Sequence, residues 1–116
     1  MATYSPALPA AMGYTVKMDE PAGYGVVRML AVKDGTTQVW NPRDDSAQCF
    51  EVLCWLLETD HQGKQICVPR NSVRCWTYDE DGEDILCWNT WHKNTPASLR
   101  AAIVEAAERV AKENAK

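Results

Sequence analysis

Residues 72–92 read SVRCWTYDEDGEDILCWNTWH, and this stretch decides the fold class. Apolar and polar side chains alternate in 72–78, and 83–92 is a longer run rich in aromatic and branched residues, so the pattern favours two β-strands. Between them, Asp79-Glu80-Asp81-Gly82 predicts a four-residue hairpin loop. Together with a short strand-like run at 64–69, the stretch predicts a three-stranded antiparallel meander.

The predicted sheet has apolar residues on both faces. A period of two places Trp76 and Tyr78 on one face, and a four-residue loop pairs them with Trp88 and Leu86 across the hairpin. Because neither face is plainly polar, we expect helices to cover both. Trp76 and Trp88 are then core residues beneath a helix, or a partner-binding platform if their face is open.

A helix is predicted before the meander, over Asp44–Glu58. Pro42 precedes it, and Asp45 is suited to accept hydrogen bonds from the free N–H groups of the first turn. Its apolar residues recur at intervals of three and four, which places them on one face: Ala47, Phe50, Leu53, Cys54 and Leu57.

A second helix is predicted at the C-terminal end, where Thr95 is an N-cap residue and Pro96 fits the first helical position. One face is apolar, with Leu99, Ile103, Ala106 and Val110. The other face is charged and expected to meet solvent, with Arg100, Glu105, Glu108, Arg109 and Lys112. The predicted class is therefore α+β.

The N-terminal residues follow no sustained period. We interpret 1–21 as a loosely ordered N-terminal arm, because it contains Pro6, Pro9 and Pro21, and 22–116 as a single domain. Residues 22–31 are compatible with a short helix. The turn signal Asp34-Gly35 predicts either a small hairpin or a plain loop.

No secretory signal or membrane-spanning run is recognisable, so a cytoplasmic location is expected.

Composition and charge exclude some functions. The chain has 116 residues and a net charge of −4, so direct binding to nucleic acid lacks electrostatic support. Five cysteines and two histidines raise the question of a metal. No Cys-x-x-Cys pair is present, and Cys67, Cys75, Cys87 and His92 converge only under a favourable register, so we predict no metal and no cofactor. No motif surrounds a cysteine or His61 that predicts a nucleophile, so we predict no enzyme activity.

The hairpin loop is strongly acidic. It is too short for a calcium-binding loop, and the plainest interpretation is a solvated tip. The alternative is a field that steers association with a basic partner surface. The residues concerned are Asp79, Glu80, Asp81, Glu83 and Asp84.

Residues 40–52, WNPRDDSAQCFEV, resemble the motif that begins a helix in the phage ABA sandwich domain family. That motif runs roughly Pro-Ser-Thr-Asp-Ile-Ala-Ala-Ala-Trp-Glu-Val. The matching residues are Pro42, Asp45, Ala47, Glu51 and Val52, with Phe50 in place of the aromatic residue. Arg43 replaces the usual cap serine. Residues 99–107, LRAAIVEAA, resemble the family's closing alanine-rich helix.

The resemblance extends over 22–110 and implies an alpha-beta-alpha sandwich, in which helices cover a small antiparallel sheet. It also implies a phage or prophage origin, and it carries no catalytic residue. We therefore expect an accessory protein in the host cytoplasm that binds a host protein without catalysis. A candidate target is a host defence system with a basic nucleic-acid-binding surface, which would make the protein an anti-CRISPR-like inhibitor.

Two alternatives remain open at this point. One is a small-molecule-binding protein whose aromatic pocket is lined by Trp76, Trp88, Arg74 and His92. The other is a virion or assembly component that forms a homo-oligomer, with the N-terminal arm packing on a neighbouring subunit.

Overall fold

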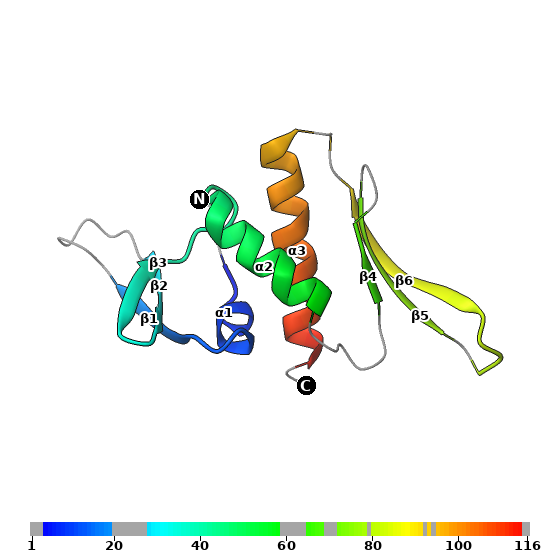
Figure 1. Ribbon diagram of the computed structural model, residues 1–116, viewed down its shortest axis with the longest axis horizontal. Helices are drawn as coiled ribbons and strands as arrows, with labels where there is room; N and C mark the ends of the chain where they lie inside the picture. The colour runs from blue at the N-terminus through cyan, green and yellow to red at the C-terminus, as the bar shows by residue number, and fades with distance from the viewer. Residues whose placement is uncertain are drawn as a thin grey trace.

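Helix α3 (Pro96–Asn114) contacts both other helices and two strands of one sheet. The computed structural model describes residues 4–19, 28–58, 65–68, 72–78, 80–91, 93 and 95–114. In these residues α3, α1 (Ala7–Ala11) and α2 (Ser46–Glu58) lie between two three-stranded sheets (Figure 1). The layers therefore run sheet, helices, sheet. The α+β class predicted from the sequence is confirmed.

The start and the apolar stripe of α3 agree with the sequence. The Ser98 N–H donates to Thr95 Oγ1 at 3.2 Å, so Thr95 is the N-cap, and the predicted stripe is buried from Ile103 onward. Burial extends beyond this stripe on both of its edges, to Ala102 on one and to Val104, Ala107 and Ala111 on the other. Alanine suits three of these positions because α3 contacts α1 and α2 as well as the strands, and a small side chain lets neighbouring elements approach closely.

The prediction that Glu108 lies on the solvent-facing side of α3 is wrong. Its side chain is buried, where it accepts a hydrogen bond from the Ser5 N–H at 2.5 Å and lies 3.5 Å from the guanidinium of Arg43. A buried carboxylate is tolerated when it is paired and hydrogen-bonded. The amphipathic pattern missed this residue because the N-terminal segment packs over that side of α3.

Residues 4–19 of the predicted arm contribute to the core. Leu8, in α1, is completely buried and belongs to the same hydrophobic cluster as the residues of α2 and α3. After α1, strand β1 (Thr15–Asp19) pairs with β2 (Arg28–Lys33), which pairs with β3 (Thr36–Val39), all antiparallel.

The turn between β2 and β3 is the one that the sequence indicated. Asp34 and Gly35 have positive φ values of 54° and 78°, the conformation that a two-residue hairpin turn needs. Of the two alternatives, the hairpin is confirmed. The short helix expected over 22–31 is not formed at 28–31, which belong to β2, and its other residues lie outside the described ones.

Helix α2 begins at Ser46, two residues after the predicted start, with the predicted cap residue Asp45 before it, and it faces the core differently. Asp45 Oδ1 accepts a hydrogen bond from the Gln48 N–H at 3.1 Å. The Gln48 side chain is buried, and hydrogen bonds satisfy its amide there. Its Oε1 accepts from the Asn41 N–H at 2.6 Å, and its Nε2 donates to the Val39 carbonyl at 2.7 Å. The buried residues are Gln48, Cys49, Val52 and Leu56. The core side of α2 is therefore not the apolar face that the sequence pattern selected.

The second sheet is the predicted meander of β4 (Gln65–Cys67), β5 (Ser72–Tyr78) and β6 (Asp84–Trp91). Its inner face packs on α3. We expected helices on both faces, but no helix or strand among the described residues covers the outer face (Figure 1). The first sheet lies on the opposite side of the helices, in the position where we expected no second sheet.

Candidate partner-binding surface

A bulge in β6 assigns the two tryptophans of the hairpin to opposite faces. Cys75 pairs with Trp88, whereas Trp76 pairs with Leu86, so Cys87 is an extra residue on its strand. The predicted pairing of Trp76 with Trp88 is therefore wrong. One extra residue inside a strand interrupts the period of two on which that prediction depended.

Trp88 belongs to the inner face and to the hydrophobic core. It is 8% exposed, and the guanidinium carbon of Arg109 lies 5.2 Å from the centre of its ring, a cation–π arrangement. Its Nε1 has no hydrogen-bond partner among the described residues. The interpretation of Trp88 as core beneath a helix is confirmed, and Trp88 is removed from the candidate binding residues.

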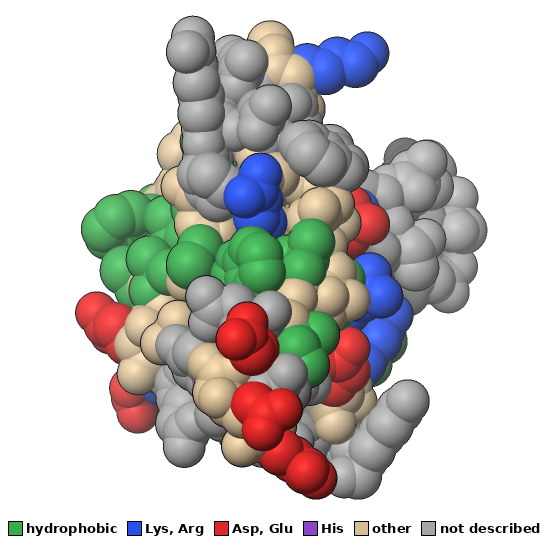
Figure 2. Space-filling model, turned by 90° about the vertical axis from the view of Figure 1, so that its right-hand side faces the viewer, with side chains coloured by type: hydrophobic (Ala, Val, Ile, Leu, Met, Phe, Trp, Pro, Cys, Tyr) green, Lys and Arg blue, Asp and Glu red, His purple; other side chains and the backbone are tan. Residues whose placement is uncertain are grey.

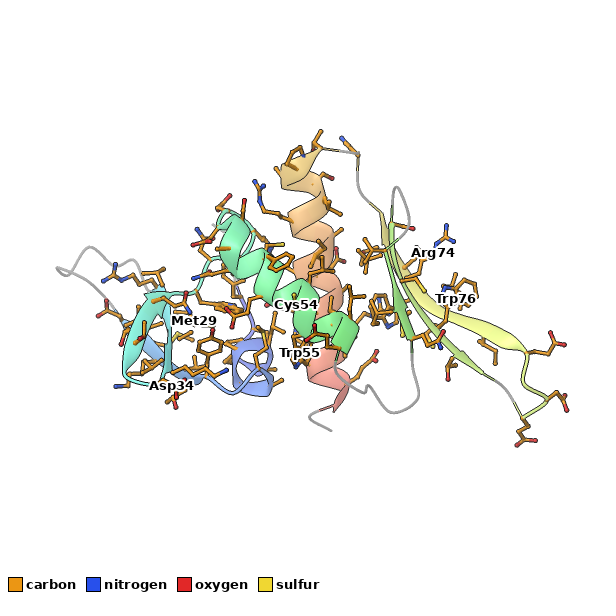
Figure 3. The ribbon with its side chains drawn as sticks, viewed as in Figure 1. Met29, Asp34, Cys54, Trp55, Arg74 and Trp76 are labelled. Carbon is orange, nitrogen blue, oxygen red and sulfur yellow. The ribbon has the colours of Figure 1, made fainter. Side chains whose placement is uncertain are left out.

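Trp76 belongs to the outer face. Figure 3 shows the side chains of Trp76 and Arg74 directed away from the helices. Leu86, which pairs with Trp76, is 42% exposed, and the thiols of Cys67 and Cys87 are exposed as well. In Figure 2 a band of apolar side chains crosses this side of the molecule. We call these residues the open sheet face: Cys67, Arg74, Trp76, Leu86 and Cys87.

The acidic hairpin tip lies beyond the end of this face. Glu80, Asp81 and Glu83 are exposed, and Gly82 turns the chain with a φ of 80°. Acidic side chains gather below the apolar band in Figure 2. Residues 79–83 separate β5 from β6, one residue more than the loop we predicted. Asp79 and the Asp84 side chain, also predicted as binding residues, lie outside what the structure describes.

The aromatic pocket proposed for a small molecule is not formed. Trp76 and Trp88 lie on opposite faces of one sheet, so they cannot line the same cavity, and His92 is outside the described residues. Neither does the described part of the chain contain a group of three or more potential metal ligands. Cys49 and Cys75 are buried, and burial raises the pKa of the Cys49 thiol although Arg100 opposes the shift.

A groove between α2 and α3 is a feature that sequence reasoning missed. Its volume is about 220 Å³, and its lining is almost entirely apolar. Phe50, at its edge, is 67% exposed, and Leu57 farther along α2 is 53% exposed. The lining residues are Ser46, Cys49, Phe50, Leu53, Pro96, Leu99, Arg100 and Ile103. The repeat of apolar residues on α2 was the available signal, but it was interpreted as the core side.

A polar contact also joins the first sheet to α2. The Tyr14 hydroxyl donates to Glu51 Oε1 and receives a hydrogen bond from Gln38 Nε2 at 3.4 Å. Burial, followed by the hydrogen bond to and the charge of Glu51, raises the pKa of Tyr14 to about 12. The Tyr14 ring lies 5.8 Å from that of Trp40, a buried residue. The phenol is therefore protonated at neutral pH and donates its proton to the hydrogen bond with Glu51.

No protein-family model, curated protein or solved structure matches this chain. The resemblance to the phage ABA sandwich domain family therefore remains a proposal based on the residues quoted above. Among the described residues, no helix has the length and apolar character needed to cross a membrane.

Proposed function

We propose that this protein acts by binding another protein, without catalysis, through the open sheet face and the acidic hairpin tip. The observation that carries the proposal is the position of Trp76, which lies on a sheet face that no described helix or strand covers. Tryptophan is enriched among the residues that dominate binding energy at interfaces.

The open sheet face has the composition of an interface centre. Trp76 and Leu86 are neighbours across two paired strands. Arg74, two residues before Trp76, lies on the same side of β5. Aromatic residues and arginine are enriched at interfaces, whereas aspartate, glutamate and lysine are depleted at their centres. The five residues that define the open sheet face include no carboxylate and no lysine, and Asp84, which pairs with Tyr78, lies beyond Leu86 toward the tip. The described acidic side chains next to this face lie at one end, in the hairpin tip.

The acidic hairpin tip favours a basic partner. Glu80, Asp81 and Glu83 project from the far end of the hairpin, where their field reaches solvent (Figure 1). Charges at the rim of an interface act mainly on the rate and the specificity of encounter. The apolar centre then holds the complex, and the tip guides the partner to it.

The partner we propose is a host protein whose basic surface normally binds nucleic acid. The net charge of −4 and the acidic hairpin tip support a basic partner. The resemblance of 40–52 to a phage family favours a phage or prophage accessory protein that works in the host cytoplasm. Inhibition of a host defence system, in an anti-CRISPR-like manner, is the activity that combines these features.

The experiment begins by identifying host proteins retained by the tagged chain and then measures binding of the purified partner. Trp76→Ala is expected to weaken the complex at least tenfold, mainly through faster dissociation. The triple variant Glu80→Gln, Asp81→Asn, Glu83→Gln is expected to slow association, and rising salt should slow association of the unaltered chain.

Met18→Ala is the matched control. Met18 is 59% exposed on β1, in the other sheet, so its removal should leave binding unchanged. If no host protein is retained, or if Met18→Ala weakens the complex as much as Trp76→Ala does, the open sheet face is not the interface.

A further inference from the structure

Helix α2 carries a second apolar face that the fold leaves outside the core. Its buried side contains Val52 and Leu56, whereas Phe50 and Leu57 are 67% and 53% exposed. This face consists of exposed Ala47, Phe50 and Leu57 with half-buried Leu53 and Cys54, which together we call the α2 stripe; Leu53 also packs against the edge of the core. None of them is charged. A helix that is apolar on opposite sides is typical of an element with neighbours on both sides.

Four residues of the α2 stripe, Phe50, Leu53, Cys54 and Leu57, are spaced symmetrically about the midpoint between Leu53 and Cys54. Phe50 and Leu57 lie at equal distances, about 5 Å along the axis, on either side of the midpoint between Leu53 and Cys54. A two-fold axis through that midpoint, perpendicular to the helix, places Phe50 opposite Leu57 of a second copy. The intervals of three and four residues are those of helices that pack side by side.

The groove between α2 and α3 lies on the same side of the molecule. Phe50 and Leu53 belong both to its lining and to the α2 stripe. Its volume of about 220 Å³ is several times the roughly 30 Å³ that one water molecule occupies, so it can admit an apolar side chain. Under the two-fold arrangement, the side chain placed over this groove is Leu57 of the second copy.

We propose that a second copy of this chain docks on the α2 stripe, with the two α2 helices antiparallel and Phe50 packed against Leu57 of the other copy. A two-fold interface must be self-complementary, and the symmetric set from Phe50 to Leu57, beside a groove, meets this requirement. Antiparallel helices also align their dipoles favourably. This interface is separate from the open sheet face, so a dimer keeps the open sheet face of each copy free for a partner.

The size of α2 sets the concentration at which the dimer should be sought. The helix has 13 residues and is therefore about 20 Å long, so the contact belongs to the small class of interfaces. We expect sedimentation velocity to show a monomer at about 1 μM and a reversible dimer as the concentration rises toward about 1 mM. Phe50→Glu and Leu57→Glu should each raise the dissociation constant at least tenfold.

Leu86→Glu is the matched control, because Leu86 is 42% exposed on the open sheet face and does not belong to the α2 stripe. It should leave the dimer intact, and far-UV circular dichroism should show that all three variants fold. A chain that remains monomeric at 1 mM overturns the proposal, and so does a dimer that Leu86→Glu abolishes. A monomer whose capture of a foreign protein depends on Phe50 would assign the α2 stripe to another protein's helix.

A cross-link tests the two-fold geometry separately. In a chain with Cys67→Ser and Cys87→Ser, Cys54 is the described cysteine that is not buried, since Cys49 and Cys75 are. The proposed axis brings Cys54 of both copies close together, so a short bismaleimide should link them into a dimer, and Phe50→Glu should suppress the product. A dimer in solution without this cross-link would contradict the antiparallel arrangement.

Discussion

Trp76 and Trp88 lie on neighbouring strands of one sheet and have different environments. Trp88 packs beneath α3 with Arg109 over its ring, whereas Trp76 points away from the helices. The bulge at Cys87 produces this difference, because it allows Leu86 and Trp88, two residues apart, to face opposite sides. One inserted residue therefore separates a predicted aromatic pair into a core residue and a partly buried residue on the outer face.

The largest expected effect is on stability, from truncation on the inner face. Trp88→Ala should lower the free energy of unfolding by about 3 to 5 kcal/mol, because it removes a buried aromatic side chain and leaves a cavity. Trp76→Ala should lower it by about 1 kcal/mol or less, since the ring is only partly buried. Urea unfolding followed by circular dichroism measures both. Equal losses would mean that the outer face is also covered.

Removal of Cys87, the extra residue of β6, tests what the bulge contributes. Deletion of Cys87 should leave the pairs Cys75 with Trp88 and Trp76 with Leu86 in a regular ladder, so both tryptophans keep their faces. We expect a loss of about 1 to 2 kcal/mol and an unchanged near-UV spectrum.

Deletion of Asn89 is the control for the bulge. Asn89 lies in the regular part of β6, between buried Trp88 and buried Thr90, so its removal forces one of them off the inner face. It should be clearly more destabilising than the deletion of Cys87. The opposite order would show that the bulge itself is needed for folding.

A smaller effect should follow from removing the cation above Trp88. Arg109→Ala is expected to lower the free energy of unfolding by about 0.5 to 1 kcal/mol, because a partly exposed cation–π contact contributes in that range. Arg74→Ala, on the open sheet face, should have less effect. Thermal unfolding compares the two variants, and the contrast should disappear in a Trp88→Leu background, where no aromatic ring remains.

The smallest expected effect is a pH dependence in the first sheet. The pKa of Tyr14 is raised to about 12, above the ordinary value of 10.0 that applies in the unfolded chain. The unfolded chain therefore loses this proton first, and the contribution of Tyr14 to stability declines as pH rises from about 10 toward 12. Tyr14→Phe should lose less stability over that interval than the unaltered chain. Melting temperatures at pH 9 and pH 11 measure the difference.

Local signals in the sequence located several elements well. Thr95 begins α3, Asp45 caps α2, and Asp34-Gly35 makes the hairpin turn. Each depends on residues within a few positions of one another, so a single sequence is sufficient to recognise it. The meander of β4, β5 and β6 was predicted for the same reason.

The misassigned residues are those whose neighbours come from far along the chain. The helix pattern predicts that Glu108 is exposed, but Ser5 and Arg43, which are distant in the sequence, contact its carboxylate in the folded chain. The apolar residues of α2 identified a helix, but Gln48 is buried and Phe50 is exposed because the chain around Val39 and Asn41 bonds to Gln48. Helix periodicity shows that a face is apolar, and it cannot show which of two apolar faces meets the core.

Local propensity and composition are sufficient for the fold class, for the two longer helices with the meander, and for the acidic charge of the hairpin tip. The order of layers, the burial of Trp88 but not of Trp76, and the exposure of Phe50 and Leu57 are visible only in the folded chain. Those outcomes depend on strand register and on contacts between distant segments. One extra residue changes such a register without leaving a recognisable pattern in the sequence.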